Sequence, residues 1–189
     1  MGFVYYFSLS CLAALLLTTG GAHLAGFSAF RALLYEHNLV SSVTSAAVFI
    51  MVVELTIGMT ALLLLVGGLQ TAVAPPLFAA SASVGVVFLM YVRRLLRHAT
   101  SLTSCGCSPL SSPMTPASLL PAATLALVSG AGFVANLLSA ADHTSALANE
   151  YGLALYTLPV LSGIVFAGIT MLIPASMPLP VTDTKEHEA

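Results

Sequence analysis

The sequence predicts an all-α integral membrane protein: a bundle of about five transmembrane helices, multi-pass in the cell membrane. The first observation is composition. Of 189 residues, 58% are hydrophobic and only 6% are charged, with a mean hydropathy of +1.00, whereas soluble domains carry roughly 25% charged residues. The second is that the apolar residues gather into stretches near the ~20 residues that cross the hydrocarbon core as a helix. A backbone in lipid must satisfy its own hydrogen bonds, which favours helices.

The predicted spans follow one another with weak breaks, and together they form one bundle over residues 1–174. The first lacks the basic start of a signal peptide, so we expect it to be retained. The third ends in a cluster of cations, and the fifth is stopped by prolines. The expected spans are about 3–21, 43–68, 73–92, 117–141 and 151–173, and residues 175–189 form a polar tail.

The connection between the first two spans is expected to hold an amphipathic helix that lies in the membrane interface. Polar side chains recur in it at i+3 and i+4 spacing, roughly opposite a set of apolar ones. The polar set is Ser28, Arg31, Tyr35 and Asn38, and the apolar set is Phe30, Leu33 and Val40. The separation is imperfect, because Glu36 and His37 fall on the apolar side.

All the cations of the chain fall on odd-numbered connections or in the tail: Arg31, Arg93, Arg94, Arg97 and Lys185. In a five-span protein these segments share one side, which the positive-inside rule places in the cytoplasm, with the N-terminus outside. The cluster of three arginines is most simply a snorkelling anchor for the third span. No basic stripe with interleaved aromatic residues suggests a nucleic-acid partner.

The longest connection carries the first candidate for chemistry, Cys105-Gly106-Cys107. A Cys-x-Cys disulfide closes a small strained ring, and such disulfides are labile and suited to exchange. Arg97 and His98 lie about two turns upstream and can stabilise a thiolate. A redox pair is one interpretation. The others are two inert loop cysteines, or half of a metal site completed by His98, His23 or His37.

Glu54 is the second candidate, because it lies near the middle of its predicted span. A carboxylate at that depth is costly unless it is neutralised or paired. It can serve as a proton relay or as a contact for a quinone or another substrate, or it can join two helices by a hydrogen bond. Its candidate ionic partners are His23 and Arg31, which lie near the adjacent helix end.

The order of these features resembles the MauE/DoxX-type redox-associated membrane proteins, a family named for methylamine utilisation. Small residues and a basic position close the first span, an Arg-containing amphipathic stretch follows, the second span has Glu-x-x-x-Gly, and an Arg-rich segment leads into Cys-Gly-Cys. The resemblance covers roughly residues 3 to 140. The matching segments are Gly20-Gly21-Ala22-His23-Leu24, Phe30 to Val40, Glu54 to Gly58, and Arg93 to Cys107.

This resemblance implies a four-helix membrane core, often with an added helix. It also implies thiol–disulfide exchange that helps a client protein mature alongside a thioredoxin-like redox partner. Cys105 and Cys107 would then be the catalytic pair, and Glu54, His23 and Arg31 would be polar positions inside or beside the bundle. From the residues themselves, no cofactor is assigned with certainty, a quinone near Glu54 is a candidate, and no metal ligand is assigned.

Two alternatives stay open. Oxidising a secreted client requires the Cys-Gly-Cys loop outside the cell, whereas the charge rule places it in the cytoplasm. The chain also departs from the family pattern after the second cysteine, where Ser108-Pro109 replaces a small or aromatic residue and Gly. The alternative function is a non-enzymatic assembly or accessory subunit, of undetermined oligomeric state, whose Cys-Gly-Cys is structural or metal-binding.

Overall fold

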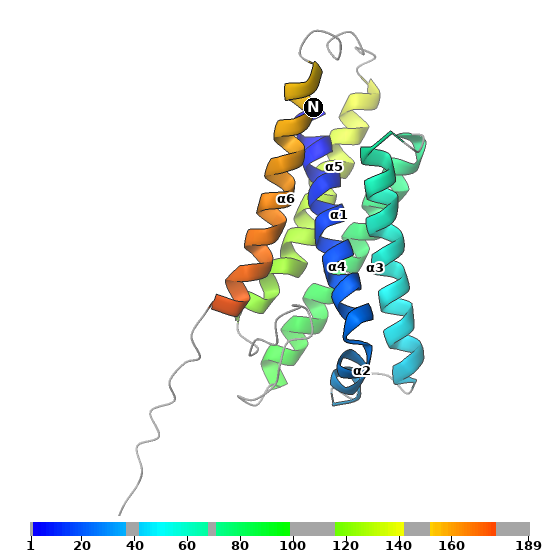
Figure 1. Ribbon diagram of the computed structural model, residues 1–189, viewed down its shortest axis with the longest axis vertical. Coiled ribbons are helices and arrows are strands. Elements are labelled where there is room, and N and C mark those ends of the chain that lie inside the picture. The colour runs from blue at the N-terminus through cyan, green and yellow to red at the C-terminus, as the bar shows by residue number, and fades with distance from the viewer. Residues whose placement is uncertain (1, 37–41, 68–70, 99–115, 142–151, 177–189) are drawn as a thin grey trace, which may run out of the picture.

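The computed structural model describes residues 2–36, 42–67, 71–98, 116–141 and 152–176 (Figure 1). Within these ranges the chain is almost entirely helical and contains no strand. Short 3-10 turns precede α4 and α5, at Thr71–Val73 and Pro116–Leu119. The helices are α1 (Gly2–Ala25), α2 (Phe27–Glu36), α3 (Val43–Leu65), α4 (Ala74–His98), α5 (Leu120–Ala141) and α6 (Gly152–Ser176).

In the described part of the chain, five helices are long and apolar enough to cross a membrane: α1, α3, α4, α5 with its preceding turn, and α6. Their outward faces carry large apolar side chains, for example Phe49 at 68% exposure and Leu127 at 73%. A soluble protein rarely exposes so much contiguous apolar surface, whereas a helix in lipid does so without cost. The predicted all-α, multi-pass membrane bundle is therefore confirmed.

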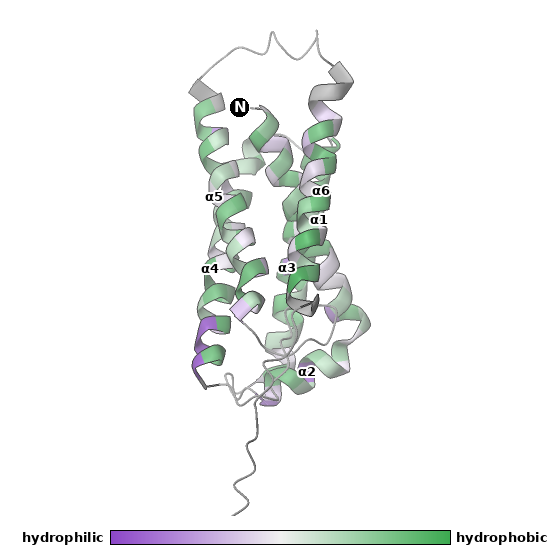
Figure 2. Ribbon diagram, turned by 90° about the vertical axis from the view of Figure 1, so that its left-hand side faces the viewer, coloured by the Kyte–Doolittle hydropathy of each residue, from purple (hydrophilic) through white to green (hydrophobic). Residues whose placement is uncertain are grey.

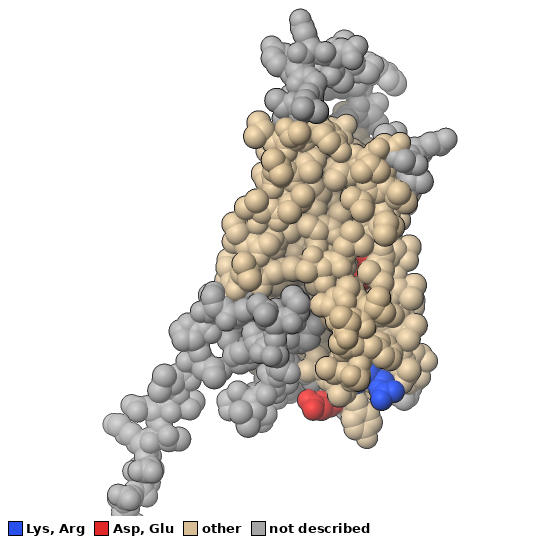
Figure 3. All heavy atoms as spheres, in the orientation of Figure 1, with Lys and Arg blue, Asp and Glu red and all other residues tan. Residues whose placement is uncertain are grey.

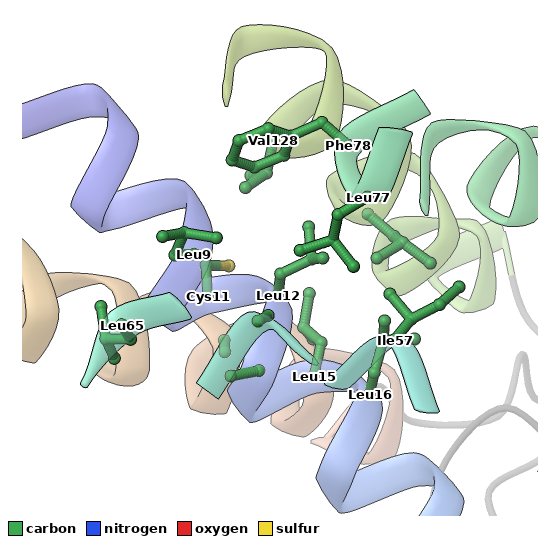
Figure 4. Packing of buried hydrophobic residues seen from close by; sticks show 14 of the residues in the cluster. Leu9, Cys11, Leu12, Leu15, Leu16, Ile57, Leu65, Leu77, Phe78 and Val128 are labelled. Carbon is green, nitrogen blue, oxygen red and sulfur yellow. The ribbon is translucent and has the colours of Figure 1, made fainter. Parts of the chain in front are cut away.

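α1 lies at the centre of the bundle and packs against α3, α5 and α6 (Figure 1). Leu9, Leu12 and Cys11 of α1 are fully buried in the apolar core that Figure 4 shows. α6 approaches α1 closely because residue 163 is glycine. A Cβ there would lie 2.7 Å from the carbonyl oxygen of Phe7.

α3 ends at Leu65, before the expected limit of its span, because Gly67 adopts a left-handed conformation with φ 73°. The amides of Val66 and Gly67 donate to carbonyls in the last turn of α3, which is how a helix commonly closes on a glycine. The hydroxyl of Tyr156 donates to the carbonyl of Leu65 at 2.6 Å and so joins α6 to the end of α3.

α2 is the amphipathic helix expected after the first span, and it lies across one end of the bundle (Figure 2). Leu34 is buried, whereas Arg31 and Tyr35 are exposed. α1 continues to Ala25, beyond the expected limit of the first span, and only Gly26 separates it from α2. His23 therefore belongs to the last turn of α1 and lies beneath α2.

The described cations lie at this same end of the bundle. α4 runs on to His98, past the expected limit at Val92, so that Arg93, Arg94 and Arg97 occupy its last turns and are exposed. Figure 2 shows the hydrophilic end of α4 at the level of α2. On the face drawn in Figure 3, the basic atoms lie at the end that carries α2, and the rest of the described surface is almost free of charge.

Candidate functional site

The site begins with Glu54, whose carboxylate lies inside the bundle and is 2% exposed. It stands in the middle of α3, flanked along that helix by apolar residues. A carboxyl group buried at that depth requires a polar partner from a neighbouring helix.

His23 supplies that partner. Its Nδ1 lies 2.8 Å from Oε2 of Glu54, and both side chains are buried. The two helices approach closely because residue 20, one turn before His23, is glycine. A Cβ at Gly20 would lie 2.9 Å from the side chain of Leu55 and 3.3 Å from Cβ of Glu54. The imidazole can therefore donate its Nδ1 hydrogen to the carboxylate in a charge-assisted hydrogen bond.

Phe30 of α2 covers the imidazole. The two rings stack with centroids 3.9 Å apart and an interplanar angle of 10°. α2 follows α1 after the single residue Gly26 and lies across the end of the bundle, which brings Phe30 onto the imidazole (Figure 2). The stack fixes the plane of the imidazole, so that its hydrogen bond to Glu54 has a defined direction.

A cavity of about 290 Å³ lies beside the pair. Its wall is almost wholly apolar, and its few polar side chains are Thr19, His23, Glu54 and Tyr91. α1 to α5 all contribute, with α2 closing one end through Phe30, Leu33 and Leu34. The buried, hydrogen-bonded His23–Glu54 pair is thus part of the wall of an apolar cavity among the membrane-spanning helices.

The helices that flank residues 99–115 both reach this cavity. Tyr91 lines it from the last turns of α4, and Pro121 and Ala122 line it from the first turn of α5. Cys105 and Cys107 are outside the described residues. The two helices that flank them therefore line the same cavity as His23 and Glu54.

The structure brings together some of the residues singled out from the sequence and separates others. It pairs Glu54 with His23, whereas Arg31 is exposed on the outer face of α2. Arg93, Arg94 and Arg97 project from the end of α4, and His98 is its last residue. Among the described residues, no group of three His, Cys, Asp or Glu side chains can hold a metal ion; His37 lies outside them.

Phe30, Tyr91 and Ala122 belong to the site but were not expected there. Phe30 stands out in the sequence only as a member of the apolar face of a short amphipathic helix, and no local pattern distinguishes it from Leu33. Tyr91 and Ala122 are separated from Glu54 by long stretches of chain, and only the packing of α4 and α5 brings them to it.

Comparison with known proteins gives a family match. The model of the family described as "Methylamine utilisation protein MauE" matches residues 1–141 of this chain. No curated protein and no solved structure matches it.

Proposed function

This chain belongs to the MauE family, and from that premise we propose that it carries out thiol–disulfide exchange in the membrane through Cys105 and Cys107, in support of the maturation of a partner protein. The match to residues 1–141 includes the Cys-Gly-Cys segment. The observation that carries the proposal is that both helices flanking this segment line the cavity that the buried His23–Glu54 pair also lines.

The exchange conserves electrons at each step. A thiolate of the client attacks one sulfur of the Cys105–Cys107 disulfide, and a mixed disulfide forms while the other cysteine leaves as a thiolate. A second client thiolate then attacks the mixed disulfide, which leaves the client oxidised and both cysteines reduced. Two electrons have passed to the pair, and a thioredoxin-like partner can take them by the reverse sequence.

The end of α4 favours this chemistry electrostatically. Arg94 and Arg97 are exposed in the last turns before the Cys-Gly-Cys segment, and nearby cations stabilise a thiolate. The same arginines also complement the negative end of the α4 dipole. This stabilising effect on the helix is enough to explain why the arginines are there, even if they do not stabilise a cysteine thiolate. The proposal is therefore tested on the cysteines and not on the arginines.

The family name fits an accessory role in methylamine utilisation. The proposed chemistry is narrower than that role, because it depends on the two cysteines and on a client with thiols. It therefore applies to any partner protein whose disulfides must be made or rearranged.

Trapping of mixed disulfides tests the proposal. Cys105→Ser or Cys107→Ser removes the thiol that resolves the intermediate, so at least one variant should accumulate a partner-linked form on a non-reducing gel. The matched control is Cys11→Ser, which removes a buried core thiol and should trap nothing. The proposal fails if neither loop variant forms a mixed disulfide. A Cys105→Ser/Cys107→Ser chain that still supports the partner would favour the accessory-subunit alternative.

A further inference from the structure

We propose that the cavity beside His23 and Glu54 is a binding site for a lipid-soluble quinone. The binding site stands on the geometry of the cavity alone. The electron transfer assigned to it below rests, in addition, on the thiol–disulfide exchange proposed above.

The combination of the cavity and the hydrogen-bonded pair points to a ligand. A pair that only joins two helices is best served by close packing around it, because an empty cavity in a bundle costs stability. Here Glu54 and His23 instead form part of the wall of a space of about 290 Å³. That volume is near the lower end of the ~300–1,000 Å³ typical of small-molecule sites.

The apolar lining of the cavity favours an apolar ligand that enters from the lipid. Most of it consists of aliphatic and aromatic side chains, at the depth of the membrane-spanning helices. Val87, one of the lining residues, is 63% exposed on the outer side of α4. The cavity wall thus reaches the side of the bundle that faces lipid, where an apolar tail attached to the ligand can lie.

The polar atoms select an uncharged, planar head group with oxygen atoms. The carboxylate of Glu54 repels an anionic head group such as a fatty acid, which would bury a second negative charge beside it. Glu54 and His23 are hydrogen-bonding groups in an otherwise apolar wall, which suits a head group with oxygen atoms. Phe30, Phe88 and Tyr91 offer aromatic surfaces against a flat ring. A quinone combines a flat ring, two carbonyl oxygens and an apolar tail.

A quinone is also a second possible acceptor for the electrons of the exchange, beside the thioredoxin-like partner. When the reduced pair meets the quinone, the two S–H bonds of Cys105 and Cys107 break and one S–S bond forms. The two electrons and two protons reach the two carbonyl oxygens, which become the hydroxyls of the hydroquinone. We assign to His23 and Glu54 the positioning of the ring.

Binding to the purified full chain in nanodiscs tests the site. The probes are ubiquinone and menaquinone with two isoprene units each, and an isoprenoid alcohol of the same chain length serves as the ligand without a ring. Ala122→Phe fills the cavity from α5, and the matched Ala131→Phe places the same side chain on the exposed face of that helix. Glu54→Gln tests the pair, with Glu36→Gln as its exposed control.

We expect saturable binding of at least one quinone, weakened by about tenfold or more in Ala122→Phe and Glu54→Gln and unchanged in Ala131→Phe and Glu36→Gln. Cys105→Ser/Cys107→Ser should bind as tightly as the parent chain, so a failure of the thiol proposal leaves this result intact. The site is overturned if neither quinone saturates, if the alcohol binds as tightly, or if folded Ala122→Phe binds like Ala131→Phe.

Discussion

At the scale of single residues, the main feature of the site is the hydrogen bond between His23 and Glu54, together with the Phe30 ring that stacks on His23. Both groups are buried, so each depends on the other to meet a charge or a hydrogen bond that water does not supply. Glu54 was identified from its depth alone, and His23 and Arg31 were its two candidate partners. Helix rotation decided between them: on α2 the side chain of Phe30 turns inward while its neighbour Arg31 is exposed. The amphipathic pattern agrees with that rotation, since Phe30 belongs to its apolar set and Arg31 to its polar set.

The pair should show a measurable coupling free energy. In a double-mutant cycle of His23→Ala and Glu54→Ala, the loss from both changes together should be smaller than the sum of the single losses by about 1 kcal/mol, a typical size for interhelical hydrogen bonds in membranes. Reversible unfolding in mixed micelles measures it. Losses that add within about 0.3 kcal/mol would show that the two side chains do not stabilise one another.

Replacing Phe30 by Leu should lower the free energy of unfolding by about 1 kcal/mol, because the aromatic stack on His23 is lost. Phe49→Leu is the matched control. Phe49 lies on the lipid-facing side of α3 at 68% exposure, so the same change there should have little effect. Equal losses in the two variants would contradict the assignment of Phe30 to the site.

At the scale of elements, the existence of five spans was predictable because a run of ~20 apolar residues has few structures other than a membrane helix. The ends of the helices were harder to predict from the sequence. α1 extends past its apolar run because His23 is met by Glu54 inside the bundle, and α4 extends because its arginines project outward. A hydropathy window ends at such polar residues, whereas a helix ends where its backbone hydrogen bonds do.

The packing of α6 on α1 predicts contrasting effects at two glycines of α6. Gly163→Ala should destabilise the chain, because the new Cβ would lie 2.7 Å from a backbone oxygen of α1. Gly168→Ala meets nothing within 4 Å, and should be neutral or stabilising by up to about 1 kcal/mol through helix propensity. Unfolding free energies of the two variants test this, and a loss of the same size in both would argue against close α1–α6 packing.

At the scale of the whole molecule, the described part of the chain is polarised along the bundle axis. One end carries α2, the described cations, the His23–Glu54 pair and the helix ends that flank Cys105 and Cys107. Part of this was predictable, since helices that cross a membrane alternate in direction and charges accumulate on one side. The cavity could not be predicted from the sequence, because residues of α1 to α5 line it and it forms only when these helices pack together.

The charge distribution predicts that the end carrying α2 faces the cytoplasm. In a chain whose native cysteines are all Ser, Ser28→Cys on α2 should react with an impermeant maleimide only after permeabilisation. Ala72→Cys, exposed at the opposite end between α3 and α4, should react in intact cells. The reverse pattern would place the Cys-Gly-Cys segment outside, as oxidation of a secreted client requires.

The central claim, that Cys105 and Cys107 exchange disulfides, is tested most directly by their redox state in living cells. Cells that express the Cys11→Ser chain are quenched with acid and alkylated with a mass-tagged maleimide, with and without prior reduction. We expect to find the pair both as disulfide and as dithiol, and we expect the ratio of the two forms to change when cells are treated with a thiol oxidant or reductant. A pair that stays fully reduced under every condition would contradict the claim.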